Sequence, residues 1–384
     1  MSGPAPAGPT LSWTFLAPGC PRPTGGDIAR FEIANELSRQ GHSVRIVHLP
    51  TSEMWIRSLD DLPWFAFDAS VDHLFGDGVD PAGIPDSDVV VYSTKLLATA
   101  LAPEVRVAGR RLVEALQGDG DHTWLPVLFL QGHGVFPPAI EDLAFRLRGP
   151  KVCVGSWLAT LLEDIGVERS DIVHIPNGID PDVFRVRRPI AGREPRVAMN
   201  FDPYPAKQGR IGLTALELAW RQHGIPAWVF GTIPLEREVE PGLAFTLAPS
   251  QAWLSEHVYN EASVFLQPSR QEGFGLCAVE AMACGCALVT TSNGGSDDYA
   301  FHGETAIVCG GSAEEMAEAV NQLVLDAALR VRVATAGARH VERFRWRDSA
   351  ARLALLGVER VNVAGGGCTT PRVDLDRVLS DLAS

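Results

Sequence analysis

The sequence has 384 residues, of which 46% are hydrophobic and 21% are charged; these proportions exclude disorder, collagen and coiled coil as its main state. At roughly 150 residues per domain, this length predicts two or three domains. Basic residues number 33 and acidic residues 47, which leaves a net charge of −14. That balance argues against a protein that binds nucleic acid or an anionic membrane through its overall charge.

The seven cysteines show no Cys-x-x-Cys spacing and mostly lie in apolar surroundings. We therefore expect buried, reduced thiols rather than disulfides or a zinc site. Residues 1–10 are rich in proline, glycine and alanine and carry no basic region, a pattern typical of neither a signal peptide nor a membrane span. Both features indicate a cytoplasmic protein.

Short apolar runs alternate with amphipathic stretches along the first half of the chain. The runs predict strands, and the stretches between several of them have helical spacing of apolar residues. Strands that are apolar on both faces and alternate with helices indicate a parallel sheet covered by helices, the doubly wound class. The expected strands are 11–16, 44–49, 89–92, 127–130, 151–154 and 172–175, and the expected helices include 27–40, 105–116 and 157–165.

A stretch rich in proline, glycine and arginine, 176–195, interrupts this rhythm and predicts an interdomain linker, after which a second series begins. Its expected strands are 197–200, 227–230, 243–247, 264–267 and 287–291, and its expected helices are 213–222, 253–261, 277–283, 313–325 and 327–340. We therefore predict an α/β protein with a first Rossmann-like domain, 1–180, and a second, 181–345. A helical tail, 346–384, can return to the first domain, and its Gly/Thr-rich part, 365–370, is expected to be flexible.

In open α/β sheets, ligands bind where strands end and helices begin. The first such place holds Gly25 and Gly26 before a helix, where backbone amides can approach an anion or a sugar closely; a simple tight turn explains the same pattern. The fingerprint G-x-G-x-x-G is missing from the sequence, so a conventional dinucleotide dehydrogenase has little support.

The second place is the loop Glu272-Gly273-Phe274-Gly275, which precedes a helix expected to start near Leu276. Its glycines would let phosphate or hydroxyl groups meet backbone donors at the positive end of that helix. Glu280 lies about one turn into the helix, and carboxylates readily accept hydrogen bonds from pairs of sugar hydroxyls. Local capping or pairing is the alternative for Glu280.

Two further loops carry polar residues. Lys207, one of only three lysines, follows the first strand of the second half together with Arg210. These cations could neutralise a diphosphate, although a solvated surface lysine is the simpler alternative. The other loop contains Gly294-Gly295 and Asp298.

These motifs resemble the donor-binding signature of the retaining glycosyltransferases of family 4, which have the GT-B fold, two Rossmann-like domains facing across a cleft. The matching stretch runs from 267 to 308 and includes the Glu272–Leu276 loop, Glu280 and Gly294-Gly295. Residues 25–42 and 175–184 resemble that family as well, so the agreement spans nearly the whole chain.

The resemblance implies transfer of a sugar from a nucleotide-diphosphate donor to an acceptor, with retention at the anomeric carbon. It further implies that Glu272 binds sugar hydroxyls, Glu280 the ribose and Lys207 the diphosphate, and that no metal or other cofactor is required. It gives His133, after a first-domain strand, a contact with the donor sugar; a structural histidine fits that position equally well. The candidate catalytic residues are His133, Glu272 and Lys207, and the candidate donor-binding residues are Gly25, Gly26, Lys207, Arg210, Gly273, Phe274, Gly275, Leu276 and Glu280.

Two departures from the family stand out. No arginine precedes Lys207 in the run 200–204, so Arg210 could substitute for it, and the usual glutamate after Gly-Gly is the shorter Asp298. The leading hypothesis is a hexosyltransferase acting on a natural-product, small-molecule or polysaccharide acceptor. The alternatives are a nucleotide-sugar epimerase or sugar phosphorylase of the same fold, or a non-catalytic binding module.

Acceptor contacts are expected from the first domain. The stretch 51–83 contains several aromatic residues that could stack on an acceptor, face a membrane or simply pack the domain. Membrane association and the oligomeric state stay open, and no nucleic-acid partner is expected. The aromatic residues are Trp55, Trp64, Phe65, Phe67 and Phe75.

Overall fold

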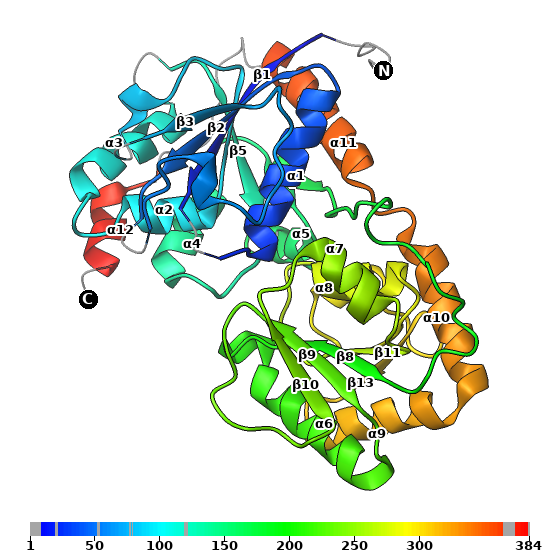
Figure 1. Ribbon diagram of the computed structural model, residues 1–384. Helices are drawn as coiled ribbons and strands as arrows, with labels where there is room; N and C mark the ends of the chain where they lie inside the picture. Colours follow the sequence, from blue (N-terminus) through cyan, green and yellow to red (C-terminus); the bar gives the residue numbers. More distant parts are fainter. Residues whose placement is uncertain are drawn as a thin grey trace. The chain divides into compact units, whose positions relative to one another are not determined.

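The computed structural model describes residues 9–19, 22–51, 54–76, 78, 80–118, 122–363 and 373–382, so the predicted flexible stretch 365–370 lies outside the described residues. The chain divides into two compact units (Figure 1). The first unit comprises Met1–Val154, Leu158–Pro176 and Trp346–Ser384, and the second comprises Gly155–Trp157 and Asn177–Arg345. The division thus falls after Pro176, whereas the sequence predicts a boundary after residue 180.

The first unit contains a parallel sheet with the strand order β3-β2-β1-β4-β5-β6-β7. Its strands are β1 (Ser12–Pro18), β2 (Ser43–Leu49), β3 (Asp72–Phe75), β4 (Val89–Tyr92), β5 (Leu125–Leu130), β6 (Lys151–Cys153) and β7 (Ile172–His174). The order reverses between β1 and β4, which is where ligands bind in sheets of this kind. The edge strand β3 is largely exposed and was not predicted, because it lacks the apolar run of a strand buried on both faces.

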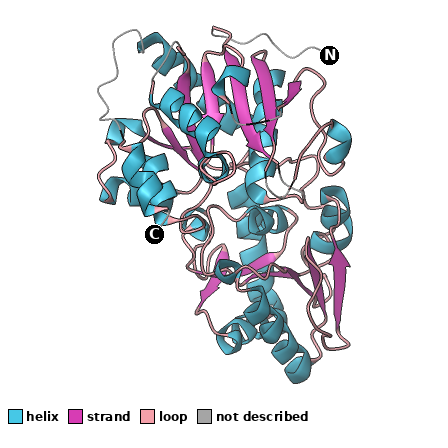
Figure 2. Cartoon of the chain, turned by 90° about the vertical axis from the view of Figure 1, so that its left-hand side faces the viewer, coloured by secondary structure: helices cyan, strands magenta, loops and turns pink. Residues whose placement is uncertain are grey.

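Helices cover both faces of this sheet (Figure 2). On one face α1 packs against α11, and on the other α2 packs against α3 and α4, with α12 beside α4. The first turn of α1 is capped by Thr24, whose hydroxyl accepts a hydrogen bond from the amide of Asp27 at 3.2 Å. The helices are α1 (Gly25–Arg39), α2 (Thr94–Ala100), α3 (Arg106–Gln117), α4 (Pro138–Arg146), α5 (Ser156–Asp164), α11 (Trp346–Val363) and α12 (Leu375–Asp381).

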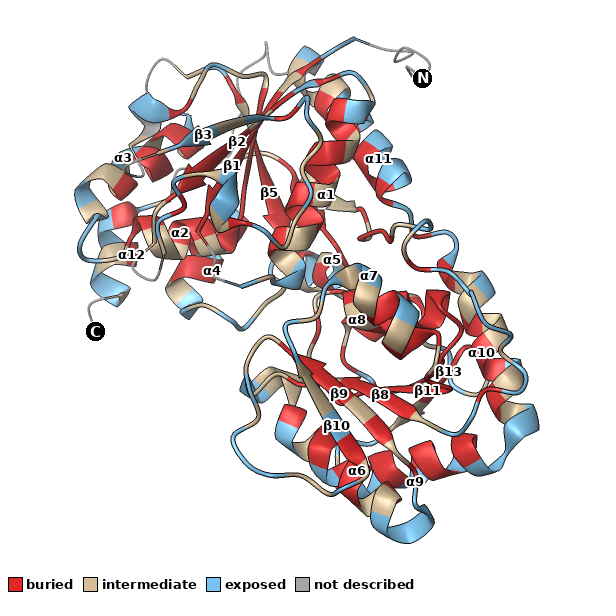
Figure 3. Ribbon diagram, viewed as in Figure 1, coloured by how far each residue is buried: buried red, intermediate tan, exposed pale blue. Residues whose placement is uncertain are grey.

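The second unit contains another parallel sheet, ordered β10-β9-β8-β11-β12-β13. Its central strands are buried along their length, which explains why they read as continuous apolar runs in the sequence (Figure 3). The strands are β8 (Val197–Asn200), β9 (Ala227–Gly231), β10 (Leu243–Leu247), β11 (Val264–Gln267), β12 (Ala287–Thr291) and β13 (Ala306–Cys309).

The helices of the second unit again lie on both faces of its sheet (Figure 1). On one face α6 and α9 pack together over a core of strand residues, and on the other α8 packs with α10 and a single π-helical segment, Leu254–Tyr259. The sequence predicts one helix over 253–261, but the α-helical part ends at Trp253 and the π turn follows. The helices are α6 (Gly209–His223), α7 (Gln251–Trp253), α8 (Leu276–Ala283), α9 (Ala313–Leu325) and α10 (Ala327–Val341).

A buried arginine fixes the linker stretch against the second unit. The guanidinium of Arg193 donates to the backbone carbonyls of Tyr259 and Ala262 at 3.1 Å and of Cys284 at 2.7 Å. The Cys284 carbonyl belongs to the end of α8, where orphan carbonyls need donors and positive charge is favourable. One of the arginines of the predicted linker therefore serves as a structural anchor for the helix that carries Glu280.

Candidate functional site

The strand order of the second sheet brings the predicted loops together. Strands β8, β11 and β12 are neighbours, so the loops at their carboxyl ends meet at one edge of the sheet. Lys207 follows β8, the Glu272–Gly275 loop follows β11 and Gly294 follows β12. Residues that lie almost a hundred positions apart in the sequence thus share one small region.

Backbone hydrogen bonds join these three loops directly. The carbonyl of Ala206 accepts from the amides of Arg270 at 2.8 Å and Gln271 at 3.3 Å. The amide of Glu272 donates to the carbonyl of Asn293 at 2.9 Å, and its carbonyl accepts from Gly295 at 3.1 Å. Glu272 is therefore fixed by its backbone on both sides, which limits where its carboxylate can lie.

Lys207 and Glu272 form an ion pair, with Nζ 2.6 Å from Oε2. The other carboxylate oxygen of Glu272 accepts from the Ser269 hydroxyl at 2.7 Å, and only 9% of the Glu272 side chain is exposed, against 35% for Lys207. Burial acts to lower the pKa of Lys207, but the adjacent Glu272 carboxylate outweighs it, so the pKa lies above the ordinary 10.5. Lys207 is therefore charged, and part of its side chain is exposed to solvent.

Helix α8 begins directly after this pair. Its first residues follow Gly275, which adopts φ = +94° and which could not carry a side chain, because a Cβ would lie 2.4 Å from the Tyr299 hydroxyl oxygen. The amides of the first turn of a helix have no intrahelical partner and carry partial positive charge. The start of α8 therefore offers backbone donors beside the Lys207 ammonium group.

Glu280 is buried within α8 and accepts a hydrogen bond from the Tyr259 hydroxyl at 3.3 Å. Burial raises the pKa of Tyr259, so this hydroxyl remains a donor at neutral pH. Burial also raises the pKa of the Cys277 thiol, and the carboxylates of both Glu280 and Glu272 raise it further. The negative charges of both glutamates thus act on Cys277, which lies between them in the sequence.

Arg210 and Asp298 have their own partners in the second unit. The Arg210 guanidinium contacts both carboxylate oxygens of Glu236 at 2.6 to 3.0 Å, on an exposed part of the surface. Asp298 accepts from the amide of Ser156 at 3.0 Å. Neither contacts the Lys207–Glu272 pair in these hydrogen bonds, and a role for Arg210 in binding a diphosphate stays a prediction.

The predicted glycines of the first unit lie in the first turn of α1. A Cβ added to Gly26 would meet Gln131 carbons at 3.6 Å and more, an ordinary contact, so the local packing does not require glycine there. Beside it, the buried Asp27 pairs with Arg30 at 2.8 Å and lies 3.8 Å from Lys95, which follows β4. Acidic and basic side chains thus lie together where the strand order reverses.

His133 also lies in the first unit, after β5, with its Nδ1 2.6 Å from a carboxylate oxygen of Glu141. The Glu141 carboxylate is buried and accepts from the amides of Gly134, Val135 and Phe136 at 3.0 to 3.2 Å. A carboxylate at one ring nitrogen of a histidine sets the orientation of the ring. The loop 133–136 is therefore organised around Glu141, a residue that the sequence analysis did not single out.

Most aromatic residues of the stretch 51–83 pack the first unit. Trp64, Phe65 and Phe67 contact Phe31 of α1 at ring-centroid distances of 4.9 to 5.9 Å. The side chains of Trp55 and Phe75 stay 49% and 38% exposed.

Two histidines border this aromatic cluster. His48 is fully buried on β2, and its Nε2 lies 3.0 Å from Nδ1 of His73 on β3. Burial first, then the charges of His73 and Arg30, lower the pKa of His48 from 6.5 to about 3. His48 is therefore neutral at physiological pH. Because it is buried, protonation of its ring would destabilise the folded first unit.

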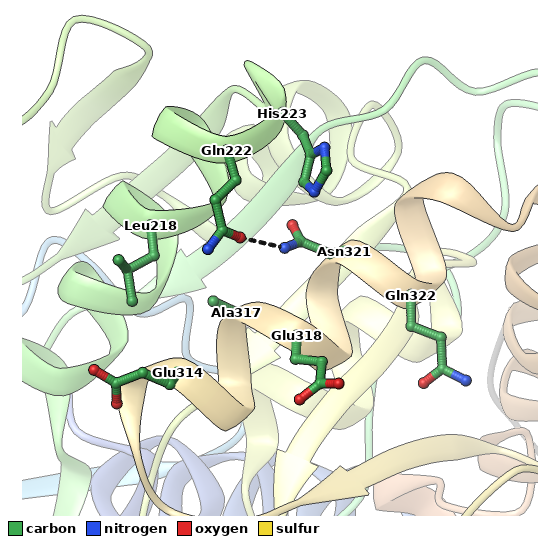
Figure 4. Close-up of a pocket in the computed structure, with 8 residues that line it drawn as sticks. All are labelled: Leu218, Gln222, His223, Glu314, Ala317, Glu318, Asn321 and Gln322. Carbon is green, nitrogen blue, oxygen red and sulfur yellow. Dashed lines mark hydrogen bonds between the residues drawn. The ribbon is translucent and has the colours of Figure 1, made fainter.

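A surface hollow of about 500 Å³ opens between α6 and α9 (Figure 4). It is lined by residues such as Gln222, Glu318 and Asn321, and the amide of Asn321 donates to Gln222 at 2.7 Å. The hollow lies towards the carboxyl end of α6, whereas Lys207 precedes the amino end of the same helix. It is a separate feature from the cluster around Glu272.

Several predicted properties can be compared with the described part of the chain. Among its residues, no three histidine, cysteine or acidic side chains are grouped as a metal site requires, and metal-independent chemistry stays a prediction. The described helices include none with the length and hydrophobicity of a membrane span. The described cysteines are free thiols, namely Cys153, Cys277, Cys284, Cys286 and Cys309.

The fold resembles that of solved glycosyltransferases. Alr3699/HepE from Anabaena, crystallised with UDP and glucose, superposes with a TM-score of 0.68 at 15% identity, covering 91% of this chain and 100% of that one. Sucrose-phosphate synthase from Thermosynechococcus elongatus also reaches 0.68 at 15% identity, covering 92% and 99%. These structures confirm the predicted fold class, an α/β protein built from two doubly wound units of the GT-B type.

A family model also matches part of the sequence. Residues 236–340 match the model of the glycosyl transferases group 1, and this segment lies within the second unit. It includes the Glu272–Gly275 loop, α8 and Gly294-Gly295. The match confirms the resemblance to family 4 glycosyltransferases that the sequence motifs predict.

Curated relatives match over a similarly short part of the chain. The D-inositol 3-phosphate glycosyltransferase of Corynebacterium jeikeium is 36% identical over 94 residues, 24% of this chain and 22% of that protein. Its counterpart from Streptomyces bingchenggensis is 37% identical over 97 residues, 25% of this chain and 21% of that protein. The chain thus matches about a fifth of the length of these relatives.

Proposed function

We propose that this protein is a retaining glycosyltransferase that moves a hexose from a nucleoside diphosphate to a hydroxyl-bearing acceptor. The observation that carries the proposal is the Lys207–Glu272 pair at the start of α8, with Glu280 buried one turn further on. The family match, residues 236–340, includes Glu272 and Glu280, and Lys207 lies before it. Structural neighbours crystallised with UDP and glucose, and with ADP and acarbose, support a nucleotide sugar as the donor.

Each residue of the cluster suits one part of such a donor. The Lys207 ammonium group and the amides at the start of α8 would neutralise the diphosphate. Glu272, which already accepts from Ser269 and Lys207, would accept from sugar hydroxyls, and Glu280 from the ribose hydroxyls. In the structure the two opposite charges pair with each other, so neither is left buried and unpaired.

The proposed reaction breaks the bond between the anomeric carbon and the β-phosphate oxygen. The acceptor oxygen forms a new bond to that carbon on the same face, and its proton passes to a phosphate oxygen of the leaving nucleoside diphosphate. Lys207 would stabilise the negative charge that develops on this leaving group. Its raised pKa keeps it protonated throughout the neutral range. His133, whose ring is oriented by Glu141, is proposed to contact the donor sugar.

The acceptor is proposed only as a small molecule or a glycan. The family match lies wholly within the second unit, to which we assign donor binding, so the acceptor named for the relatives does not carry over to this chain. A cytoplasmic site of action, as the cysteine pattern indicates, is part of the same proposal.

The test is to incubate the protein with UDP-, GDP-, ADP- and dTDP-hexoses and to measure the released nucleoside diphosphate, with and without a pool of polyols, aglycones and oligosaccharides. We expect release that depends on both the donor and an acceptor. Binding without release would instead favour a non-catalytic module. Formation of an isomeric nucleotide sugar would favour an epimerase, and a sugar 1-phosphate formed with inorganic phosphate would favour a phosphorylase.

A further inference from the structure

Two side chains outside the predicted site hold the backbone of the Glu272–Gly275 loop. The indole N–H of Trp157 donates to the carbonyl of Gly273 at 3.1 Å. The hydroxyl of Tyr299 donates to the carbonyl of the next residue, Phe274, at 2.8 Å. Two consecutive peptide groups of the loop are therefore tied by two different side chains.

These bonds determine which way the loop's amides face. In a planar trans peptide, the C=O of one residue and the N–H of the next point in opposite directions. Because the Gly273 carbonyl faces Trp157, the N–H of Phe274 faces away from Trp157. Because the Phe274 carbonyl faces Tyr299, which is fully buried, the N–H of Gly275 faces away from the Tyr299 hydroxyl. The direction of both amides is thus set by contacts within the protein.

The surroundings of Trp157 are shaped to admit its ring. A Cβ on Gly294 would lie 2.8 Å from the indole, and Gly294 has φ = +79°. A Cβ on Gly155 would lie 2.4 Å from the Gly273 carbonyl oxygen that Trp157 binds. Next to Trp157, the amide of Ser156 donates to Asp298 at 3.0 Å. The segment Gly155–Trp157 accordingly groups with the second unit rather than with the chain around it.

Tyr299 is held just as firmly. Its ring packs edge-on against Phe274 at 5.7 Å, and Phe344 contacts both rings, at 5.3 Å from Phe274 and 6.5 Å from Tyr299. Burial raises the pKa of Tyr299 well above its usual value, so the hydroxyl stays a donor. The backbone carbonyl of Tyr299 in turn accepts from the Thr305 hydroxyl at 2.7 Å.

We propose that Trp157 and Tyr299 are positioning residues for the donor diphosphate, acting through the Gly273 and Phe274 carbonyls to aim the amides of Phe274 and Gly275 at the terminal phosphate. This inference rests on the proposed function. It also explains Asp298, which fixes the backbone next to Trp157 instead of contacting the ligand. The two side chains supply preorganisation, because the amides need not reorient when an anion binds.

The experiment compares the full-length protein with Trp157→Phe and Tyr299→Phe, which delete one N–H or O–H donor each and keep an aromatic ring. Calorimetric titration of the unaltered protein with UDP, GDP, ADP and dTDP first selects the nucleoside diphosphate that binds. That diphosphate and its monophosphate are then titrated into each variant. Ser255→Ala is the control, since it deletes a buried hydroxyl that donates to the Val183 carbonyl at 2.6 Å in the same unit.

We expect each variant to bind the diphosphate about five- to tenfold more weakly, the loss of roughly one well-oriented hydrogen bond. Affinity for the monophosphate, which lacks the terminal phosphate, should stay within about twofold, and the control should match the unaltered protein. Equal losses for the monophosphate and the diphosphate, or no loss for either, would overturn the inference while leaving the proposed function in place. If the unaltered protein binds none of the nucleotides, the proposed function fails and the inference with it. Should circular dichroism show that one variant is unfolded, the other decides.

Discussion

Replacing Lys207 by methionine is the most direct test of the candidate site. Methionine keeps most of the aliphatic length of lysine but removes the charge that pairs with Glu272 at 2.6 Å. The proposed function makes this charge the main cation at the donor diphosphate. A hydrogen bond from a charged donor contributes about 1.5 to 3 kcal/mol, so nucleoside diphosphate affinity should fall by about 10- to 150-fold.

The effect on stability should be much smaller. Because about a third of the Lys207 side chain is exposed, solvent screens the pair, and its contribution to folding should not exceed about 1 kcal/mol. For a domain of this size, that corresponds to a fall in melting temperature of about 2–4 °C. Because the pKa of Lys207 is raised, its contribution is complete below pH 10.5 and is lost only as pH rises through the higher folded-state pKa.

The assay is calorimetric titration of the selected nucleoside diphosphate at pH 7, with a melting curve of each protein. Arg221→Met is the matched control, because it removes one positive charge from an ion pair of the same unit, with Glu240 at 2.6 Å. We expect the control to bind as the unaltered protein does. If Lys207→Met binds the nucleotide within twofold of the unaltered protein, the assignment of Lys207 to the diphosphate is wrong.

Three further outcomes follow from particular contacts. Gly275→Ala should weaken nucleotide binding and lower the melting temperature, because its Cβ would lie 2.4 Å from the Tyr299 hydroxyl, whereas Gly303→Ala, also at positive φ but in open space, should leave binding unchanged. Glu280→Gln should weaken binding of UDP by about tenfold but of 2′-deoxy-UDP much less; equal losses would argue against a ribose contact. Because burial lowers the pKa of His48 from 6.5 to about 3, the unfolded chain binds a proton that the folded one does not, and the first unit should lose about 2 kcal/mol between pH 6.5 and 5. Urea unfolding at both values should show a shallower pH dependence in His48→Leu, and an unchanged slope would contradict this reasoning.

Pattern alone predicted most of the fold, because buried parallel strands read as apolar runs. It failed for two edge strands, the exposed β3 and the half-buried β13, and for the single helix expected over 253–261, where a π turn follows Trp253. Such a turn arises from packing, and no periodicity of apolar residues in the sequence indicates it. The sequence also contains no signal for strand order, so it predicts that Lys207 and Glu272 lie at strand ends but not that their strands are neighbours.

The candidate site was predictable only where a residue type carries the chemistry. The carboxylates and the lysine were recognised for that reason, whereas Trp157 acts through a backbone carbonyl 116 residues away. A tryptophan with this role looks the same in the sequence as one that packs a core. For Arg210, the sequence does not reveal the exposed ion pair with Glu236, and its role at the diphosphate stays a prediction.

The return of α11 to the first unit has a consequence for biosynthesis. The main segment of the second unit, Asn177–Arg345, begins and ends side by side, because the amide of Ile179 donates to the carbonyl of Phe344 at 3.0 Å. This segment can therefore close on itself once Arg345 has been translated. The first unit still lacks α11 at that moment, and Gly357 of α11 lies against the indole of Trp13. The unit that is translated first is therefore the last to have all of its elements. A chain truncated after Arg345 should fold its second unit, whereas its first unit would lack α11.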